Sequence, residues 1–538
     1  MAEPVIIGLD AGTSVIKAVA FDTSGREIGK AARKNALQYV EGGGVEQDLH
    51  ETWRAARETL RELSESMPGL SDRVIAVAIT GQGDGTWLID AQGEPVGPAM
   101  LWLDARSSAL VADWRDSDVG RSTYGITGTG LNQSMQSGQL RWLRDNRPER
   151  LDAAATAFHC KDWLYFRMTG CRVTDGTEAV WTFGNYRTGD YDDSVLSAFG
   201  LSRYRHLLPE IVDGSRSHDP LTAKAAAATG LKAGTPVVLA PVDMQTTALG
   251  GGVFDPDRRV ACSVIGSTGA HLCVRHRPED VVLRDQAGYT MPFVEPGTRM
   301  QLVSNMAATL NIDWFVEGIN ALLQAVGQPT CSHGELLSRL DAALARVPPG
   351  RVIYHPFISA SGERGPFVNP WARAQFLGLS TEVTQLDMAR AVYEGIAFAA
   401  RDCYSALEAA PGEVRVTGGA AQSATLRGIL AAALGVPIRT LHREETGAAG
   451  AAMVATLSLG LHGDLAAACQ RWVTPYLDDP VRPDTALADV YDRLFPVYRQ
   501  AYSHSAEFWR GFHAVGGGDG TPTTDGAEPG TRQQESEQ

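Results

Sequence analysis

The chain has 538 residues, enough for at least two domains that each bury a core of their own. Hydrophobic residues make up 44% and charged residues 21%, as in ordinary globular proteins. The formal net charge of −15 argues against a surface for nucleic acid or anionic membrane, because such surfaces need net or clustered positive charge.

The first residues of the chain predict three consecutive strands. An apolar strand over residues 5–9 is followed by a turn over residues 10–14 and a second strand over residues 15–22. Ser24 and Gly25 then turn the chain into a third strand at residues 26–31.

A helix and another buried strand follow. Asp48 and Glu51 have the spacing of a capping box at the start of the helix. Residues 74–80 are apolar and predict a strand, which leads into the polar loop Gly81-Gln-Gly-Asp-Gly85. The residues that share the apolar face of the helix are Leu49, Trp53, Ala56, Leu60 and Leu63.

The strand-turn-strand pattern starts again in the second half of the chain. A strand over residues 236–239 leads into Asp243, and strands over residues 260–265 and 270–274 surround a turn. This echo predicts a second domain of related architecture, although no repeat is visible residue by residue. Further on, helices at residues 386–407, 423–434 and 446–457 alternate with strands at residues 414–417 and 437–440.

These elements predict an α/β fold with two domains joined near residue 250. We expect an N-terminal domain of residues 1–248 and a C-terminal domain of residues 249–505. Residues 515–538 contain almost nothing apolar and predict a disordered tail.

The sequence has neither the pattern of a signal peptide or membrane span nor the cysteine spacing typical of disulfides. The start, Met1-Ala-Glu-Pro4, has no basic region of a signal peptide, and no apolar stretch approaches a membrane span in length. The seven cysteines are scattered without a Cys-x-x-Cys pair, which favours buried reduced thiols over disulfides or metal ligands. We therefore expect a cytoplasmic protein without membrane or nucleic acid partners.

The first turn, Asp10-Ala-Gly-Thr-Ser14, has the composition of a phosphate-binding turn. Glycine lets the backbone approach a phosphate, and the hydroxyls of Thr13 and Ser14 can donate to its oxygens. Asp10 is suited to hold Mg²⁺ through water, and Lys17 on the next strand can counter negative charge. The alternative is an ordinary hairpin turn.

Two further glycine turns have the same character. Gly266, Ser267 and Thr268 repeat the glycine and hydroxyl chemistry, although they also suit a plain turn. Residues 417–423 lie between a strand and a helix, where Gly418 and Gly419 allow a flat base or ribose to lie against the backbone. The alternative there is a tight turn. None of these turns is a Walker loop.

Asp243 is a lone carboxylate between the two hydroxyl-bearing turns in sequence. It follows an apolar run and precedes the glycines at residues 250–252. A carboxylate placed among phosphate turns indicates a base that removes a hydroxyl proton while ATP donates its γ-phosphate. The alternative is that Asp243 caps a helix.

With these motifs in order, the chain resembles the FGGY family of carbohydrate kinases from Val5 to about Leu459. Each motif is short, but so many in one order are specific. They are Asp10-Ala-Gly-Thr-Ser14, Val45-Glu-Gln-Asp48, Ile79-Thr-Gly-Gln82, Leu101-Trp-Leu-Asp-Ala-Arg106, Thr169-Gly170 with Asp175, the Asp243 stretch, residues 266–269, Gly362-Glu-Arg-Gly-Pro366, Tyr393-Glu-Gly395, residues 418–423 and Glu445-Thr-Gly-Ala-Ala-Gly450.

The resemblance implies two actin-like (ribonuclease-H-like) domains with a central cleft that holds ATP and substrate. It implies phosphorylation of a sugar or polyol hydroxyl with ATP and Mg²⁺, with Asp243 as the general base and Asp10 and Asp243 at the metal. The implied ATP contacts are Thr13, Ser14, Lys17, Gly266, Ser267, Thr268, Gly418, Gly419, Ala420 and Gln422. Ala420 stands where many members have a third glycine, and Ser267-Thr268 inverts the commoner order.

The substrate is expected to lie against the loop after residue 80 and the segment around Trp102. A carboxylate such as Asp84 can accept hydrogen bonds from two vicinal hydroxyls, and Trp102 can cover a carbon face, although a polar loop and a core aromatic are the plainer readings. The candidate substrate contacts are Gln82, Gly83, Asp84, Trp102, Asp104, Asp243 and Gln245.

The loop also bears on which substrate is used. Gln82-Gly83-Asp84 matches neither Gln-Met-His of xylulose kinases nor Gln-Arg-Glu of glycerol kinases, and the loop with the opening turn most resembles those of erythritol kinases. That resemblance implies a four-carbon polyol phosphorylated at a terminal hydroxyl. Xylulose, ribulose, xylitol and glycerol remain alternatives, as does a catalytically silent sugar or nucleotide sensor on the same fold. A homodimer is also expected.

Four other polar residues have plainer explanations. Glu363 and Arg364 are expected to make local hydrogen bonds that join the second domain to the cleft. His159 and His271 are expected to be packed or to face solvent rather than to act in catalysis.

Overall fold

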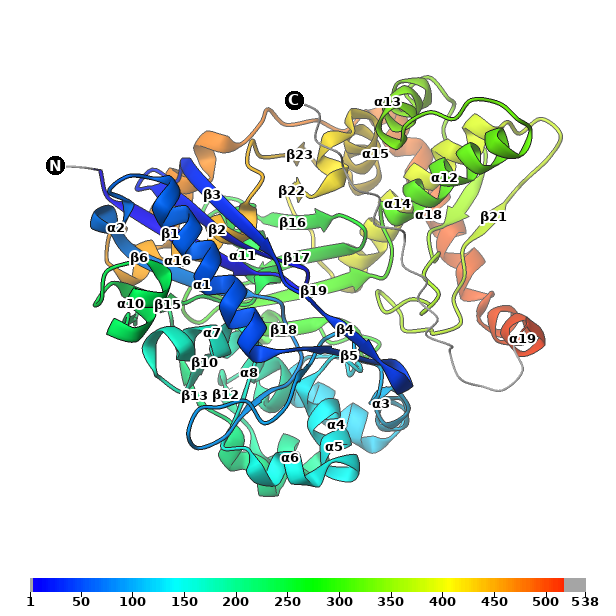
Figure 1. The fold of residues 1–538 in the computed structure, drawn as a ribbon. Coiled ribbons are helices and arrows are strands. Elements are labelled where there is room, and N and C mark those ends of the chain that lie inside the picture. Colours follow the sequence, from blue (N-terminus) through cyan, green and yellow to red (C-terminus); the bar gives the residue numbers. More distant parts are fainter. Residues whose placement is uncertain (1–2, 517–538) are drawn as a thin grey trace.

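The computed structural model describes residues 3–516 (Figure 1). Residues 515 and 516 end helix α19 (Ala506–Gly516), and the rest of the predicted disordered tail lies outside the described residues. None of the helices within this range combines the length and the apolar character needed to span a bilayer.

The first half of the chain forms a six-stranded sheet in the order β14-β15-β6-β1-β2-β3. Strand β1 pairs antiparallel with β2 and parallel with β6, and β6 pairs parallel with β15. The strands are β1 (Val5–Ala11), β2 (Val15–Asp22), β3 (Glu27–Lys34), β6 (Val74–Gly81), β14 (Asp219–Pro220) and β15 (Pro236–Leu239).

The second half forms another six-stranded sheet, in the order β18-β19-β17-β16-β22-β23. Its strands β19-β17-β16-β22-β23 run in the same order and relative directions as β3-β2-β1-β6-β15, which confirms the architectural echo predicted from the sequence. The strands are β16 (Val260–Ile265), β17 (Gly269–Arg275), β18 (Tyr289–Pro292), β19 (Arg299–Asn305), β22 (Glu413–Thr417) and β23 (Ile438–Arg439).

Alternate residues of β1 face two different cores, because side chains of a strand point to opposite faces. Val5, Ile7 and Leu9 pack on one face with helices α1 (Leu49–Ser66), α7 (Cys160–Thr169) and α10 (Ala223–Thr229). The predicted apolar face of α1 is buried in this core. Asp48 caps α1 by accepting from the Glu51 backbone, which is one half of the predicted capping box.

The other face of the first sheet shares a core with the second sheet. Ile6 on that face packs in the same cluster as Cys262, Leu272 and Met300 of the second sheet. The helices that cover the outer face of the second sheet lie at the upper right of Figure 1. They are α12 (Leu310–Ala325), α13 (His333–Leu344), α14 (Gln385–Ala406), α15 (Ala424–Leu434) and α18 (Thr485–Ser503).

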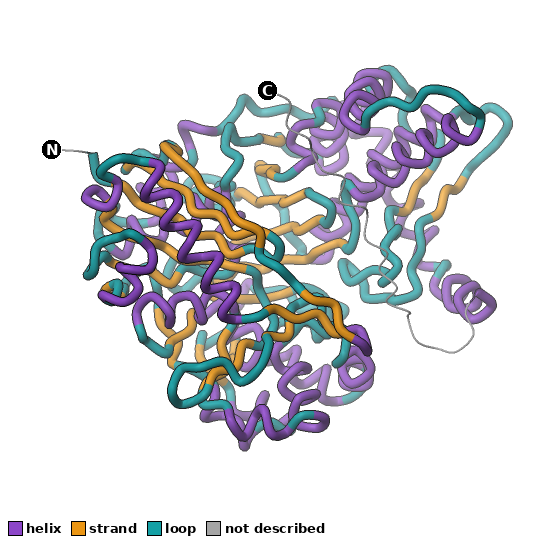
Figure 2. Tube along the Cα trace, viewed as in Figure 1, coloured by secondary structure: helices purple, strands orange, loops and turns teal. Residues whose placement is uncertain are grey.

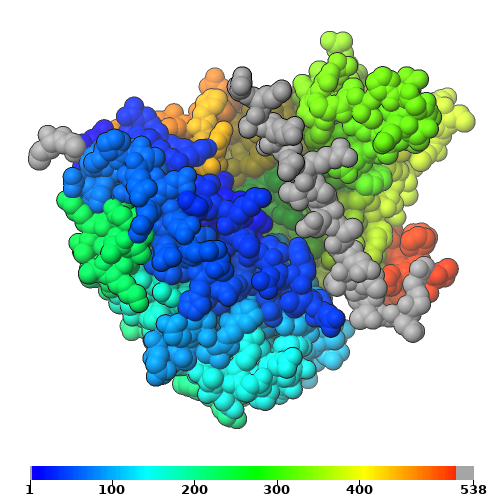
Figure 3. Space-filling model, viewed as in Figure 1, coloured from blue at the N-terminus to red at the C-terminus, as the bar shows by residue number. Residues whose placement is uncertain are grey.

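A large insertion between β6 and β15 carries most of the remaining helices, at the bottom of Figure 2. Its helices are α3 (Ser108–Arg115), α4 (Asp118–Thr127), α5 (Gln136–Asn146), α6 (Pro148–Ala153), α8 (Gly176–Phe183) and α9 (Asp193–Ala198). In the space-filling view of Figure 3 the blue and cyan first half of the chain lies at the left and below, and the later green to yellow part at the upper right.

Short elements complete the fold. The small sheets contain β4 (Gln38–Val40), β5 (Gly44–Gln47), β7 (Trp87–Ile89), β8 (Ala99–Met100), β9 (Thr156–Phe158), β10 (Val173–Asp175), β11 (Gly184–Asn185), β12 (Asp190–Tyr191), β13 (Glu210–Val212), β20 (Ile353–His355) and β21 (Gln375–Leu377). The remaining α-helices outside the crossing described next are α2 (Leu70–Arg73) and α17 (Leu465–Trp472).

Two helices cross between the sheets, α11 (Asp243–Gly250) and α16 (Thr446–Ser458). A methyl group on Gly450 would lie 1.9 Å from the Thr246 carbonyl oxygen, and one on Gly250 would lie 2.1 Å from the Thr446 carbonyl oxygen. Helix α16 lies late in the sequence yet packs on the first sheet, where Gly8 of β1 meets the Ala448 backbone. The division of the chain near residue 250 stays a prediction about domains.

We predict that Gly450→Ala lowers the free energy of unfolding by about 1–3 kcal/mol, because the added methyl group forces the two helix backbones apart. Gly428→Ala is the matched control, since a methyl group there meets nothing within 4 Å inside helix α15. The control is expected to stabilise by about 0.5–1 kcal/mol through helix propensity. Urea denaturation measures both, and equal stability changes would contradict the close crossing.

Candidate functional site

Asp10 and Asp243 lie at the same edge of the first sheet. Asp10 is the last residue but one of β1, and Asp243 is the first residue of α11, which follows β15. Because β1, β6 and β15 run parallel, their carboxyl ends meet at one edge. The helix cap is Val242, so Asp243 is not the N-cap, and its Oδ1 accepts from the Met244 N–H at 2.6 Å.

The two carboxylates interact electrostatically. Burial raises the pKa of Asp243 well above its usual range, and the charge of Asp10 adds to this effect. Burial also raises the pKa of Asp10 to about 6, against the opposing influence of Lys17. A methyl group on Gly447 of α16 would lie 2.7 Å from Asp10 Oδ2, so a larger residue there would have to displace this carboxylate.

The pair of Asp10 and Asp243 suits Mg²⁺ better than it suits a metal ion whose ligands all come from the protein. Among residues 3–516, no group of three or more His, Cys, Asp or Glu side chains is arranged to hold an ion. Mg²⁺ commonly takes one or two carboxylates and completes its shell with water and substrate phosphates. Asp10 and Asp243, both with raised pKa, offer two carboxylates whose mutual repulsion a cation relieves.

The predicted first phosphate turn is shorter than expected. Strands β1 and β6 stay paired through Asp10 and Ala11, so only residues 12–14 form the turn. Ser14 is exposed there, whereas the Nζ of Lys17 forms an ion pair with Glu445 at 2.9 Å. Lys17 is therefore committed to the start of α16, and its contact with ATP stays a prediction.

Thr13 joins the turn to the predicted substrate loop. Its hydroxyl donates to Gln82 Oε1 at 2.9 Å and accepts from Trp102 Nε1 at 2.9 Å. Gln47 completes the network by donating to the Thr13 carbonyl oxygen and accepting from the Gln82 amide. The structure thus brings Thr13, Gln82 and Trp102 together, which the sequence had assigned to two separate sites.

The second and third glycine turns adjoin one another. Gly418 has a φ of 89°, and a methyl group on it would lie 2.6 Å from the Ile265 carbonyl oxygen and 3.2 Å from the Gly266 nitrogen. Ser267 and Thr268 are exposed in the turn between β16 and β17. The hydroxyl turn and the predicted adenosine turn therefore form one continuous surface.

Cavities open on both sides of the third turn. A cavity of about 410 Å³ is lined by Gly419, Ala420, Gln422 and apolar side chains that include Ile312 and Leu426. A second cavity, of about 720 Å³, is lined by Gly418, Gln422 and, across from them, Arg443 and Tyr476. Each cavity is large enough for an adenine ring, and each is lined by residues predicted to contact adenosine.

The substrate loop presents a buried carboxylate. Asp84 has a φ of 57°, which is unusual for a residue other than glycine, and its side chain is buried. Tyr289 of β18 donates to Asp84 Oδ2 at 3.4 Å, while Oδ1 has no hydrogen-bond partner among the described residues. Burial and the charge of Glu178 raise the pKa of Asp84 to about 7, whereas His159 and Arg364 lower it.

The neighbours of Gly83 explain why a glycine stands at this position. A methyl group there would lie 2.7 Å from Val242 Cγ2 and 3.2 Å from the Trp181 ring. The indole of Trp181 on α8 occupies the space that a longer side chain in the loop would need. Gly83 thus shapes the wall between Asp84 and the start of α11.

Two predicted substrate contacts have other partners. Asp104 is fully buried, and its oxygens accept from the Val45 N–H at 3.0 Å and from the Arg106 guanidinium. The structure therefore argues against the prediction that Asp104 contacts a substrate. Gln245 donates to the Pro292 carbonyl oxygen at 2.8 Å, which links α11 to β18, and its contact with a substrate stays a prediction.

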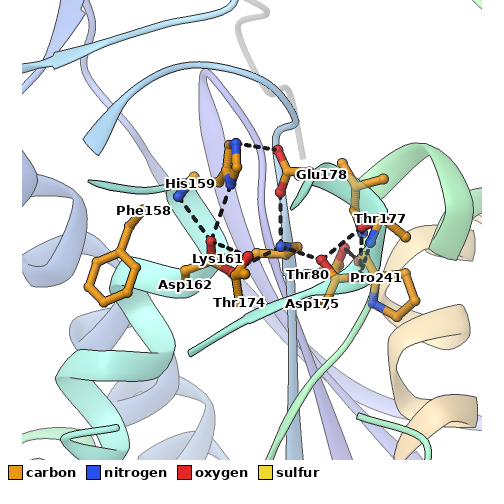
Figure 4. Close-up of polar contacts among 12 residues, drawn as sticks. Thr80, Phe158, His159, Lys161, Asp162, Thr174, Asp175, Thr177, Glu178 and Pro241 are labelled. Carbon is orange, nitrogen blue, oxygen red and sulfur yellow. Dashed lines mark hydrogen bonds and ion pairs between the residues drawn. The ribbon is translucent and has the colours of Figure 1, made fainter. Parts of the chain in front are cut away.

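A buried ionic cluster, missed in the sequence, joins α7, β10 and α8 (Figure 4). The Nζ of Lys161 is 3.0 Å from Asp162 Oδ1, 2.7 Å from Asp175 Oδ1 and 2.9 Å from Glu178 Oε2. Although burial opposes it, the three carboxylates raise the pKa of Lys161 well above its usual value. His159, predicted to be packed, is buried beside Asp162 at 3.3 Å.

The cluster acts on the site through charge. Glu178 raises the pKa of Asp84 and of Asp243, while its own Oε2 pairs with Lys161 Nζ at 2.9 Å. Residues 161–178 contain six charged residues, of which the four in the cluster are buried. Charges set among apolar residues were the one signal in the sequence, because charged residues are rarely buried unless they are paired.

Comparisons with known proteins agree with this geometry. The N-terminal domain of the FGGY family of carbohydrate kinases matches residues 5–250, and the C-terminal domain matches residues 261–459. The chain belongs to the FGGY family of carbohydrate kinases. A kinase family implies ATP as the phosphoryl donor.

Similar proteins cover nearly the whole of this FGGY kinase. It is 47% identical over 505 residues to the erythritol kinase of Brucella abortus, covering 94% of this chain and 97% of the relative. It is 27% identical to the L-xylulose/3-keto-L-gulonate kinase of Escherichia coli, covering 94% and 98%.

Solved structures of sugar kinases share its fold. The xylulose kinase of Rhodospirillum rubrum superimposes with a TM-score of 0.82 at 27% identity, covering 94% and 100% of the two chains. The gluconate kinase of Lactobacillus acidophilus has a TM-score of 0.85 at 24% identity, covering 95% and 100%. The predicted pair of actin-like, ribonuclease-H-like halves is thereby confirmed.

We predict that Lys161→Met destabilises the FGGY kinase by about 3–5 kcal/mol, because it leaves three buried carboxylates without their counter-charge. Lys224→Met on the exposed side of α10 is the control and is expected to change stability by less than about 0.5 kcal/mol. Chemical denaturation at neutral pH measures both. A loss below about 1 kcal/mol for Lys161→Met would contradict the structural role of the cluster.

Proposed function

We propose that this FGGY kinase transfers the γ-phosphoryl group of ATP to a terminal hydroxyl of erythritol. The main support for erythritol as the substrate is the 47% identity to an erythritol kinase over 94% of the chain. The buried carboxylate of Asp84, with one oxygen that has no hydrogen-bond partner within residues 3–516, supports a substrate that offers neighbouring hydroxyls.

The chemistry rests on Asp243 and the glycine turns. Asp243 Oδ accepts the proton of the attacking hydroxyl, and the raised pKa of Asp243 makes that carboxylate a stronger base than an exposed one. Asp10 and Asp243 would hold Mg²⁺, which supplies charge neutralisation at the phosphates when bound. In this proposal residues 12–14 and 266–268 would donate to phosphate oxygens, and Gly418, Gly419, Ala420 and Gln422, which line the two cavities at the third turn, would contact the adenosine.

We extend the proposal to location and assembly. All seven cysteines are free thiols in the structure, and five of them are buried, which suits the reducing cytoplasm. A homodimer remains part of the proposal from the sequence.

Asp243→Asn is expected to reduce turnover by about 10²–10⁴-fold, since the amide cannot accept the hydroxyl proton. Binding of ATP is expected to change little, because the glycine turns are untouched. Asp257→Asn, at an exposed position shortly after α11, is the matched control and should keep full turnover. Single-turnover kinetics and calorimetry separate the two effects, and near-normal turnover in Asp243→Asn would remove this residue from the chemistry.

The substrate is tested by ADP release over three- to five-carbon polyols and ketoses with ATP and Mg²⁺. Erythritol is expected to have the highest kcat/KM, ahead of glycerol, xylitol, xylulose and ribulose. A lower rank than glycerol and xylulose would refute the choice of erythritol while leaving the kinase reaction in place. Polyol binding in calorimetry without any ADP release would instead support a silent sensor.

A further inference from the structure

The free oxygen of Asp84 is held in a defined direction. The backbone of Asp84 lies in the left-handed region, and the next residue, Gly85, donates its N–H to the Ser134 carbonyl oxygen at 3.1 Å. With Oδ2 taken by Tyr289, the buried Oδ1 is the acceptor that the described protein leaves open. An open, buried acceptor is costly unless a ligand or water supplies a donor.

The group that orients Asp84 comes from the other half of the molecule. Tyr289 lies on β18 of the second sheet, whereas Asp84 follows β6 of the first. Asn132 in the insertion donates its amide to the Tyr289 hydroxyl oxygen at 2.7 Å. Because that oxygen accepts from Asn132, its own hydrogen is directed at Asp84.

The tyrosine ring is fixed independently of its hydroxyl. It packs edge-on against Trp181, with 5.1 Å between ring centroids, and Trp181 in turn fills the space beside Gly83. Removal of the hydroxyl alone is therefore expected to leave the ring and the loop in place.

We propose that Tyr289 is a specificity-determining residue, which with Asn132 orients Asp84 so that Oδ1 accepts from the substrate hydroxyl farthest from the phosphorylated one. The inference rests on the proposed polyol kinase function and deepens it. Tyr289 acts through Asp84 and is a positioning residue for the distal hydroxyl. A three-carbon polyol lacks that hydroxyl and gains nothing from the arrangement.

Five charged or titratable groups act on Asp84. They are Glu178 of α8, His159 before α7, Arg364 of the second half, Tyr289 itself and Asp243 of α11. The hydrogen bond from Tyr289 lowers the pKa of Asp84, which burial sets at about 7. Loss of this donor therefore raises the pKa further, and the fall in kcat/KM toward acid pH should begin at a higher pH.

The test is Tyr289→Phe in the full chain, assayed with erythritol and with glycerol. We expect the KM for erythritol to rise about tenfold, the lower end for a hydrogen bond to a charged group, because the bond is long. The kcat for erythritol should stay within about twofold, and the KM for glycerol should not change. The acidic limb of kcat/KM for erythritol should move to higher pH.

Two further variants make the result decisive. Asn132→Ala should shift the erythritol to glycerol ratio in the same direction, because it releases the Tyr289 hydroxyl. Tyr124→Phe removes another buried hydrogen bond between the halves, to the Arg284 carbonyl oxygen at 3.0 Å, and should leave the ratio unchanged. An equal loss on both substrates, or no loss in Tyr289→Phe, overturns the inference.

Failure of the proposed function would give a different result from failure of the inference about Tyr289. If the unmodified protein prefers another substrate, the comparison uses that substrate and its analogue that is one carbon shorter. A protein that phosphorylates neither would refute the function itself before Tyr289 is examined.

Discussion

The close backbone approach of helix α16 to its neighbours is the constraint on which the rest of the site depends. Two of its contacts leave no space for a side chain on a glycine: Gly450 against the backbone of α11, and Ala448 against Gly8 of β1. Gly447 lies against the Asp10 carboxylate. Helix α16 is therefore in contact with both the strand that carries Asp10 near its end and the helix that begins with Asp243. Because interiors are close-packed, a small shift of α16 would move the two carboxylates relative to each other.

That arrangement gathers negative charge in one enclosed region. Asp10, Asp243, Asp84 and Glu178 each have a pKa raised chiefly by burial, and several raise one another further. Lys161 is the buried counter-charge on the side of Glu178, whereas the cation that acts on Asp10 is the half-exposed Lys17, which is paired with Glu445. The charge that remains is what a magnesium nucleotide would neutralise.

The sequence was informative where the signal was local. Alternating and apolar runs located the paired strands of both sheets, and the glycine turns at Gly266 and Gly418, predicted separately, do meet in space. It failed where the outcome depends on distant partners. Asp104 looked available for a substrate, but its oxygens accept from the Val45 N–H, which is distant in sequence, as well as from Arg106. Lys161 and Glu178 look like surface charges in a sequence, and Tyr289 looks like an ordinary core aromatic, because nothing local reveals what they face.

The residues proposed for the reaction and those proposed for substrate choice differ in the same way. The residues proposed for phosphoryl transfer lie at turns that follow strands of the two sheets, so short motifs in a fixed order identify them. The residues around Asp84 come from a loop, the insertion and the second half, and only their packing assembles them. Thr13 connects the two sets, because its hydroxyl bonds to both Gln82 and Trp102. A change of substrate can therefore arise from residues such as Tyr289 and Trp181 while the phosphate turns stay as they are.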